Sequence, residues 1–461
     1  MKHRAYDVLV IGGGNAGLCA AITARRAGAR VLVVESATRD FRGGNSRHTR
    51  DIRYMHEAAT EFVTGPYRED EFWEDLRQVI GGETNESLAR LVIRESRELA
   101  DWMSAQGVRW QRPLRGTLHL ARTNLFMLGG GKAMVNAYYD TAAHLGIEVA
   151  YESEVRELEI RDDRFIAGSL NGGSGRIESK ALVVASGGFE ANIPWLKEIW
   201  GDAADNFVIR GTRHNQGLML KELLRLGAKT TGDPRGCHAI ALDARAPKFD
   251  GGIVTRLDSV PFGIVVNKNA RRFYDEGEDF WPKRYAIWGG LIARQPEQIA
   301  YSIIDAKAAP LFLPSVFPPI EARSIGALAS ALGLDPRSLT EVVDRFNQSV
   351  RPGTFDPGRL DDCRTEGLDP PKSHWARRIE TPPFYGYPLR CGITFTYLGV
   401  AVDDKARVIM QHGRPARNIF AAGEIMAGNI LTRGYLAGFG LTIGAVFGRI
   451  AGREAARHAG H

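Results

Sequence analysis

The fold is decided by the stretch Tyr6-Asp-Val-Leu-Val-Ile-Gly-Gly-Gly-Asn-Ala-Gly17. Its first half is an apolar run typical of a buried strand, and its second half is a glycine turn that opens a helix-like segment ending at Gly28. A second apolar run, Val31-Leu-Val-Val34, ends at the acidic residue Glu35. A strand, glycine turn, helix and strand within about 30 residues form the unit that builds a parallel sheet.

The glycine turn has the spacing of a dinucleotide-binding fingerprint. Gly12 permits the tight turn, Gly14 lets the backbone approach a pyrophosphate, and Gly17 lets the helix pack on the sheet. The helix N-terminus offers N–H groups and a positive dipole end to phosphates, and Glu35 is placed to accept ribose hydroxyls. The alternative is a sheet whose glycine turn binds nothing. The predicted dinucleotide contacts are Gly12, Gly14, Asn15, Ala16, Gly17 and Glu35.

The composition is that of an ordinary globular chain of 461 residues, 44% hydrophobic and 25% charged, which is long enough for roughly two or three domains. Its net charge of +6 comes from scattered basic residues, a pattern that argues against nucleic acid as a partner. The uncharged stretch 434–448 is shorter than the ~20 apolar residues of a spanning helix. The N-terminus enters a strand without an apolar signal region, so we expect a cytoplasmic protein.

The four cysteines, Cys19, Cys237, Cys363 and Cys391, show no C-x-x-C spacing. We therefore predict no metal or iron–sulfur site in this chain. Any redox chemistry must use another cofactor.

Two later strands repeat the pattern of an apolar run that ends in glycine. They are Ala181-Leu-Val-Val-Ala185 and Asn418-Ile-Phe-Ala-Ala-Gly-Glu424, so the sheet is predicted to combine both ends of the chain. The intervening residues 232–353 include a hairpin-like run at 263–273 and one helix with apolar spacing from Leu328 to Phe346. The predicted fold class is α/β. A parallel-sheet, Rossmann-like domain spans 1–231 and 354–461, and an inserted α+β capping domain spans 232–353.

The chain resembles the FAD-dependent flavoproteins of the fumarate reductase and succinate dehydrogenase superfamily over nearly its whole length. The motifs that carry the resemblance lie at 10–18, 42–46, 185–189, 272–276 and 421–424. The resemblance implies bound FAD, with Glu424 at the ribitol and the N-terminus of a final helix near the flavin. The further FAD contacts that it implies are Gly43, Gly44, Asn45, Ser46, Val155, Ser186, Gly187, Leu441 and Thr442.

Within that superfamily, segments 42–50 and 272–285 are most similar to the FAD-dependent tricarballylate dehydrogenases. This resemblance implies a small polycarboxylate substrate, with tricarballylate oxidised to cis-aconitate. It also implies that electrons leave through a separate membrane-associated protein carrying iron–sulfur or haem groups.

Three departures from the fumarate reductase pattern refine the prediction. Ser46 occupies the position of the histidine that holds flavin covalently in some members, and His48 lies two residues on, so we expect non-covalent FAD. Phe395 replaces a substrate-binding histidine, which implies a substrate other than fumarate or succinate. The substrate-clamping arginine aligns with Tyr435. Either Arg433 is the displaced arginine, or Tyr435 has taken over the contact.

Oxidation beside a carboxylate needs a hydride acceptor, which FAD supplies, and a cation that stabilises developing negative charge. Arginine suits the second task because its fork binds both carboxylate oxygens. The segment that carries the proton in fumarate reductases offers Lys283, Arg284 and Tyr285 here, and we favour Arg284. The alternative for Arg284 is a surface pair with Glu276 or Asp279.

His238 and Arg433 complete the set of candidate catalytic residues. His238 occupies the place of a substrate-contacting histidine in the superfamily, although a structural histidine fits the sequence equally well. Arg433 lies between the strand ending at Glu424 and the final helix, so it is the favoured carboxylate clamp.

Other functions remain open at this point. The stretch Tyr435-Leu-Ala-Gly-Phe-Gly440 is similar to the tyrosine and glycine that hold the ketone in 3-ketosteroid dehydrogenases. The alternatives are therefore an enzyme of that type, a related flavoprotein associated with corrin-ring contraction in cobalamin synthesis, or a non-catalytic flavin subunit that relays electrons. A steroid site should be apolar with paired tyrosines, whereas a polycarboxylate site should gather several arginines.

Overall fold

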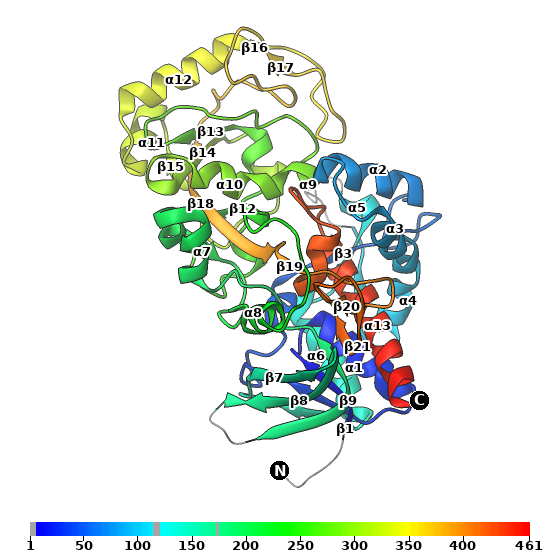
Figure 1. The fold of residues 1–461 in the computed structure, drawn as a ribbon. Helices are drawn as coiled ribbons and strands as arrows, with labels where there is room; N and C mark the ends of the chain where they lie inside the picture. Colours follow the sequence, from blue (N-terminus) through cyan, green and yellow to red (C-terminus); the bar gives the residue numbers. More distant parts are fainter. Residues whose placement is uncertain (1–5, 114–119, 172–174) are drawn as a thin grey trace.

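The computed structural model describes residues 6–113, 120–171 and 175–461. Its larger sheet has the strand order β20-β21-β9-β1-β2-β6, and the hairpin β7–β8 continues it from β9 (Figure 1). The central strands β21, β9, β1, β2 and β6 run parallel, which confirms the predicted fold class. The strands are β1 (Tyr6–Ile11), β2 (Val31–Val34), β6 (Glu148–Ala150), β7 (Val155–Arg161), β8 (Arg164–Leu170), β9 (Arg176–Val184), β20 (Arg407–Ile409) and β21 (Pro415–Ala421).

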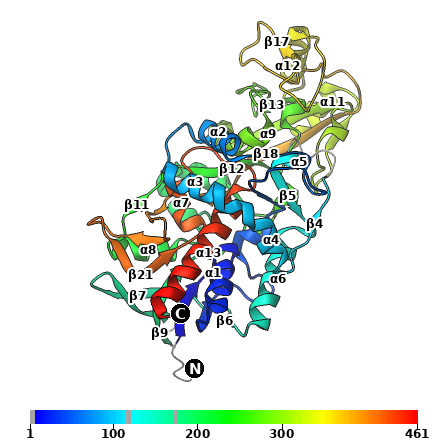
Figure 2. The same cartoon turned by 90° about the vertical axis from the view of Figure 1, so that its right-hand side faces the viewer.

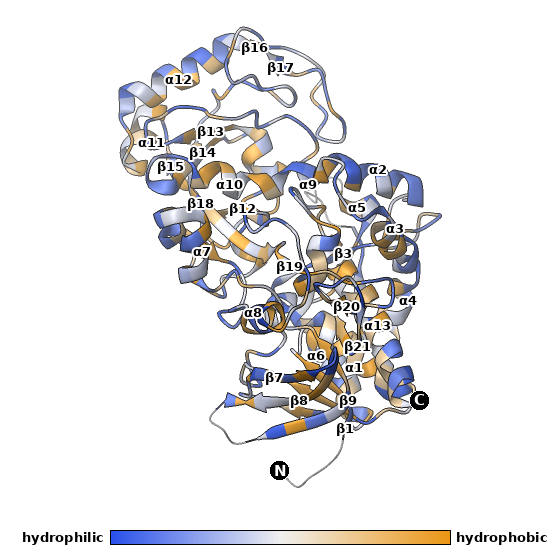
Figure 3. Ribbon diagram, viewed as in Figure 1, coloured by the Kyte–Doolittle hydropathy of each residue, from blue (hydrophilic) through white to orange (hydrophobic). Residues whose placement is uncertain are grey.

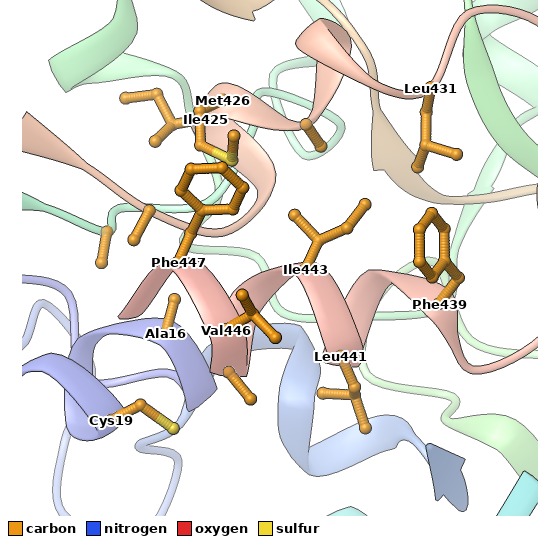
Figure 4. Packing of buried hydrophobic residues seen from close by; sticks show 14 of the residues in the cluster. Ala16, Cys19, Ile425, Met426, Leu431, Phe439, Leu441, Ile443, Val446 and Phe447 are labelled. Carbon is orange, nitrogen blue, oxygen red and sulfur yellow. The ribbon is translucent and has the colours of Figure 1, made fainter. Parts of the chain in front are cut away.

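Two helices from opposite ends of the chain cover this sheet. They are α1 (Asn15–Arg26) and α13 (Phe439–Ala459), which lie side by side (Figures 1 and 2). Glycines permit the close approach, because a Cβ at Gly448 or Gly452 would collide with the α1 backbone. Hydrophobic side chains of α13 fill the space toward both α1 and the segment after β21 (Figure 4). The end of the chain is thus part of the core of the first sheet.

A second, six-stranded sheet lies above the first (Figure 1). Its long strand β18 (Phe384–Thr396) pairs with four others: β10 (Val208–Ile209), β12 (Cys237–Asp243), β14 (Ile299–Asp305) and β15 (Ile320–Ala322). Strand β13 (Ile264–Asn267) pairs with β14. The predicted domain boundaries stay predictions, but this sheet extends outside 232–353 because β10 and β18 belong to it.

One local expectation for the central segment was wrong. The apolar residues from 328 to 346 lie on two helices, α11 (Ile325–Leu332) and α12 (Pro336–Ser349). Gly333, with φ +69°, ends the first helix, and Asp335 caps the second by accepting a hydrogen bond from the Ser338 amide at 2.8 Å. The hairpin-like run 263–273 does turn back on itself, with an antiparallel bridge between Val266 and Arg272, while β13 pairs along its length with β14.

Smaller elements surround the two sheets. Helices α3 and α4 lie beside α13 (Figure 2), and the outer face of α12 is more hydrophilic than the central strands (Figure 3). Across the described ranges, no helix is both long and apolar enough to span a membrane. The remaining elements are α2 (Glu69–Ile80), α3 (Glu86–Glu95), α4 (Leu99–Ser104), α5 (Leu120–Thr123), α6 (Gly130–His144), α7 (Ile193–Trp200), α8 (Leu218–Arg225), α9 (Trp281–Arg284), α10 (Trp288–Ala293), β3 (Asp51–Arg53), β4 (Trp110–Gln111), β5 (Asn124–Met127), β11 (Thr230–Thr231), β16 (Val350–Arg351), β17 (Arg364–Thr365) and β19 (Gly399–Val400).

Candidate active site

A deep cleft opens at the carboxyl ends of β1, β2, β9 and β21 and encloses about 1230 Å³ of space, open solvent included. This is the edge of a parallel sheet at which nucleotides bind in open α/β folds. Most of the predicted dinucleotide contacts line it: Gly12, Gly14, Asn15, Ala16, Glu35, Gly44, Asn45, Ser46, Val155, Ser186, Gly187, Glu424 and Leu441. The other three, Gly17, Gly43 and Thr442, lie outside the lining.

The glycine turn has the geometry that a pyrophosphate requires. Gly12 adopts φ +102°, and a Cβ there would collide with the carbonyl of Ala185, the residue that follows β9. Gly14 immediately precedes α1, whose N-terminus carries no side-chain cap. A Cβ at Gly14 would come within 3.6 Å of Ser46 Oγ, which in turn accepts a hydrogen bond from the Asn15 amide at 3.0 Å. The start of α1 therefore faces the cleft through backbone and small side chains, as anion binding needs.

Glu35 is buried at the end of β2 and fixes the shape of this turn. Its Oε2 accepts hydrogen bonds from the amides of Gly13 (3.1 Å) and Gly43 (3.4 Å), and its Oε1 accepts one from Ala37 (2.9 Å). The same carboxylate lines the cleft. Ser46 and Glu35, with the open helix end, fit the adenosine diphosphate half of FAD, and bound flavin would supply the hydride acceptor.

One buried cation faces the cleft without a partner. Arg210 follows β10, is 7% exposed and lines the cleft. Its guanidinium forms no hydrogen bond and no ion pair with any residue of the described ranges, and its Nε is both buried and unsatisfied. Burial lowers the pKa of Arg210 to about 10, and the nearby cations Arg256 and Arg50 add to this effect. A buried cation in this condition is poised to bind an anion.

The two neighbouring arginines share acidic partners behind the cleft. Arg256 Nε lies 2.7 Å from Asp258 Oδ1, and Arg50 Nη2 lies 3.4 Å from Asp258 Oδ2. Arg50 also contacts Asp51, with 3.5 Å between Nε and Oδ2. Two arginines, Arg50 and Arg256, are therefore paired with two aspartates, whereas Arg210 has no carboxylate partner among the described residues. Charge counting leaves an excess positive charge at this end of the cleft.

His238 and Tyr435 stack against each other in the cleft, with ring centroids 4.0 Å apart. His238 Nδ1 lies 2.5 Å from Thr394 Oγ1, whereas its Nε2 is buried without a hydrogen-bond partner in the described structure. Burial, with Arg210 and Arg256 nearby, lowers the pKa of His238 well below its usual value. This histidine is therefore neutral at pH 7. The Tyr435 hydroxyl accepts a hydrogen bond from the Gly440 amide at 2.7 Å.

The structure does not bring the other two candidate catalytic residues to the cleft. Arg284, at the end of α9, is held by Glu278 and donates a hydrogen bond from Nη2 to the Tyr274 hydroxyl at 3.3 Å. Its carboxylate partner is therefore Glu278 rather than Glu276 or Asp279. Arg433 is exposed and lines a different cavity, whose lining also includes Asp233. The arginine in the cleft is Arg210.

Sequence reasoning missed Arg210, Arg256 and Asp258. The available signal was weak: Arg210 directly follows the short apolar run Val208–Ile209, and Arg256 stands two residues before Asp258. Such pairs are common on protein surfaces. Only the pairing of β10 with β18 places Arg210 beside the cleft.

Comparison with known proteins identifies the family. The model described as "FAD binding domain" matches residues 7–441. The chain belongs to this family. The match confirms the predicted FAD cofactor and the resemblance to fumarate reductase flavoproteins at the level of the superfamily.

Curated relatives include oxidoreductases that act on different substrates. The chain is 26% identical to an NADH:fumarate oxidoreductase of Klebsiella pneumoniae over 99% of its length, but it spans only 48% of that protein. It is 28% identical to a probable fumarate reductase of Shewanella frigidimarina, and the match covers 98% of this chain and 75% of that protein. A 4-oxocyclohex-2-ene-1-carboxylate 5-dehydrogenase of Sinomonas cyclohexanicum is 27% identical, and the match covers 81% of this chain and 65% of that protein.

Solved structures support the fold. An open flavocytochrome c3 fumarate reductase gives a TM-score of 0.75 at 22% identity, covering 100% of this chain and 79% of that one. A 3-ketosteroid-Δ4-(5α)-dehydrogenase from Rhodococcus jostii gives a TM-score of 0.73 at 21% identity, covering 98% of this chain and 97% of that one. The names of the relatives place the chain among FAD-dependent oxidoreductases.

Proposed function

We propose that the protein is an FAD-dependent dehydrogenase that oxidises tricarballylate to cis-aconitate. In this reaction a hydride leaves one carbon for the flavin, and a proton leaves the adjacent carbon beside a carboxylate. The FAD is bound non-covalently. Ser46 supports this, because it stands where other members carry the attachment histidine, and its Oγ is engaged by the Asn15 amide. His48 contacts Asp250 instead of the cleft, with 3.0 Å between Nε2 and Oδ1.

The observation that carries the proposal is the guanidinium of Arg210, which lies in the cleft without a partner among the described residues. A carboxylate matches its fork and relieves the cost of burying the charge. Asp51 and Asp258 balance the charges of Arg50 and Arg256, so the excess positive charge at this end of the cleft is that of Arg210. This excess favours a substrate that carries a carboxylate over a neutral ketone.

His238 is the residue that we assign to proton removal. Its Nε2 has no partner among the described residues and can accept a proton, and the imidazole is neutral at pH 7 because burial, together with Arg210 and Arg256, disfavours a further cation. A bound polycarboxylate neutralises those arginines. The pKa of His238 then rises, and the imidazole becomes a stronger base when the substrate is present.

Electrons are proposed to leave through a separate membrane-associated protein with iron–sulfur or haem groups. Support comes from the related fumarate reductase whose structure is described as a flavocytochrome. A partner of this kind would have to approach the flavin cleft.

A second candidate function is oxidation of a cyclic ketone that also carries a carboxylate. The observation that favours it is the pairing of the Tyr435 hydroxyl with the Gly440 amide, two groups able to turn toward one carbonyl oxygen. The 4-oxocyclohex-2-ene-1-carboxylate 5-dehydrogenase named above acts on such a compound. In this alternative, Arg210 would hold the carboxylate and Tyr435 the ketone.

The deciding experiment follows flavin absorbance during anaerobic addition of tricarballylate, succinate, a 4-oxocyclohexanecarboxylate or a 3-ketosteroid. We expect tricarballylate alone to bleach the flavin quickly. Bleaching by the ketones and not by the acids would overturn the proposal and make Tyr435→Phe the next variant. A protein that no compound bleaches, although it is reduced by dithionite, would indicate an electron-relay subunit.

A further inference from the structure

A chain of polar contacts connects the short helix α9 to the turn that carries Tyr435. Helix α9 lies beside α2 (Figure 1), and Lys283 Nζ on α9 is 2.5 Å from Asp75 Oδ1 on α2. Asp75 Oδ2 accepts a hydrogen bond from the Tyr67 hydroxyl at 2.9 Å. The same hydroxyl accepts a hydrogen bond from Arg53 Nη1 at 2.7 Å. Because Arg53, Tyr67 and Asp75 are buried, salt screens these contacts little.

The other end of this chain of contacts is the turn before α13. Arg53 Nε donates a hydrogen bond to the Ala437 carbonyl at 3.0 Å, and Asn124 Nδ2 donates one to the same oxygen at 2.8 Å. Of these two donors, only Arg53 is charged. Ala437 lies between Tyr435 and Gly440, which both line the flavin cleft. The position of the Ala437 peptide therefore sets where these two residues lie.

Two cations in the described ranges contact the carboxylate of Asp75. Lys283 is at 2.5 Å, whereas Arg53 Nη1 is 3.7 Å from Asp75 Oδ2. Lys283 therefore carries most of the charge compensation, and Arg53 stays directed at the Ala437 carbonyl. If the lysine were removed, the buried carboxylate would attract Arg53 more strongly. The guanidinium would then turn toward Asp75, and its Nε would leave Ala437.

We propose that Lys283 is a positioning residue, which neutralises Asp75 and thereby keeps Arg53 on the turn before α13. Tyr435, on that turn, stacks on His238, to which we assigned proton removal. Loss of the lysine should therefore slow flavin reduction and leave the affinity for the substrate carboxylate unchanged. This effect on catalysis rests on the proposed function, whereas the effect on the turn does not.

The first experiment measures hydrogen–deuterium exchange of the FAD-loaded protein without substrate. Lys283→Met should speed exchange across residues 435–440, because the buried arginine leaves the turn. Asp75→Asn and the double variant K283M/D75N should exchange like wild type, because a neutral side chain at position 75 does not attract that arginine. The matched control is Arg77→Met, which removes a cation from an exposed ion pair on the same helix as Asp75.

Equal exchange of residues 435–440 in wild type and K283M would overturn the proposal. Faster exchange in D75N would do so too, because either substitution would break a merely structural link between α9 and α2. FAD content and thermal melting check that each variant folds. If K283M does not fold, the double variant decides the matter, since it must fold and exchange like wild type for the proposal to stand.

The second experiment follows anaerobic flavin reduction by tricarballylate in a stopped-flow instrument. K283M should lower the limiting rate about 10-fold, because small misplacements of reacting groups are costly, and should leave the dissociation constant unchanged. K283M/D75N should regain the wild-type rate, and additive losses in the double variant would contradict the proposal. If tricarballylate does not reduce the wild-type flavin, the proposed function fails, and the exchange measurement alone decides the role of Lys283.

Discussion

At one end of the cleft a dinucleotide would meet backbone and small side chains from a local motif, whereas at the other end a substrate would meet Arg210, an arginine from a distant segment of the chain. Gly12, Gly14 and Glu35 lie within one strand-turn-helix-strand unit. Arg210 reaches the cleft because β10 pairs with β18, and Arg50 and Arg256, which lie behind it, come from other segments of the chain. The first end is a property of local sequence, and the second is a property of the assembled fold.

The largest expected effect concerns the dinucleotide end of the cleft. Gly12→Ala should abolish FAD binding, because the new Cβ collides with the Ala185 carbonyl and φ is +102°, a conformation that costs about 1–3 kcal/mol for other residues even without a clash. FAD content and thermal melting measure the effect. Gly201→Ala is the matched control, since that glycine also has positive φ but no neighbour within 4 Å. Retention of full FAD content by G12A would contradict the assignment of the turn.

The next largest effect concerns the substrate end of the cleft. Arg210→Met should lower kcat/KM for tricarballylate by about 100-fold while FAD binding persists, because a charge-assisted bond worth about 1.5–3 kcal/mol is lost. Anaerobic flavin reduction at varied substrate concentration measures the effect. Arg213→Met is the control, because Arg213 is on the same segment with its side chain 68% exposed. Equal losses in both variants would exclude a specific role for Arg210.

The Arg210→Met variant should be more stable than wild type when no substrate is present. Removing a buried cation that has no described partner relieves its desolvation cost, so we expect R210M to raise the free energy of unfolding by about 1–3 kcal/mol. Thermal melting of the FAD-loaded protein measures this gain. A loss of stability would mean that Arg210 is structural.

A smaller effect concerns pH and stability. Burial lowers the pKa of His238 in the folded state, so the unfolded chain binds more protons below the unfolded value of about 6.5. Stability from this group is therefore complete above that pH and is lost progressively as the pH falls below it. His238→Gln should show a correspondingly weaker acid dependence in urea unfolding. The exposed His144 on α6 provides the control substitution, His144→Gln.

The smallest effects concern the two arginines outside the cleft. Arg284→Gln and Arg433→Gln should each change kcat/KM less than about twofold, because surface pairs contribute little. Steady-state kinetics with an artificial electron acceptor measure this. A loss comparable to that of R210M would show that the cap moves to bring one of them to the substrate.

The sequence was informative where function depends on backbone shape. The glycine turn, Glu35 and the strand ending at Glu424 were predicted, because phosphate binding demands small residues at fixed spacing. The two helices between 325 and 349 were read as one, because apolar spacing alone does not show the break at Gly333. Arg210 was missed because its importance lies in the absence of a partner, which only the folded chain reveals.

The packing of α13 against α1 and the first sheet also bears on how the chain is made. The nucleotide-binding half contains β1 at one end of the sequence and β21 with α13 at the other. The glycine turn can form early on the ribosome, but its supporting core is incomplete until α13 has emerged. At about 5–20 residues per second, synthesis of the intervening chain takes roughly 20 to 80 seconds. During this interval the apolar faces of β1 and α1 depend on chaperones, or on transient contacts, for cover.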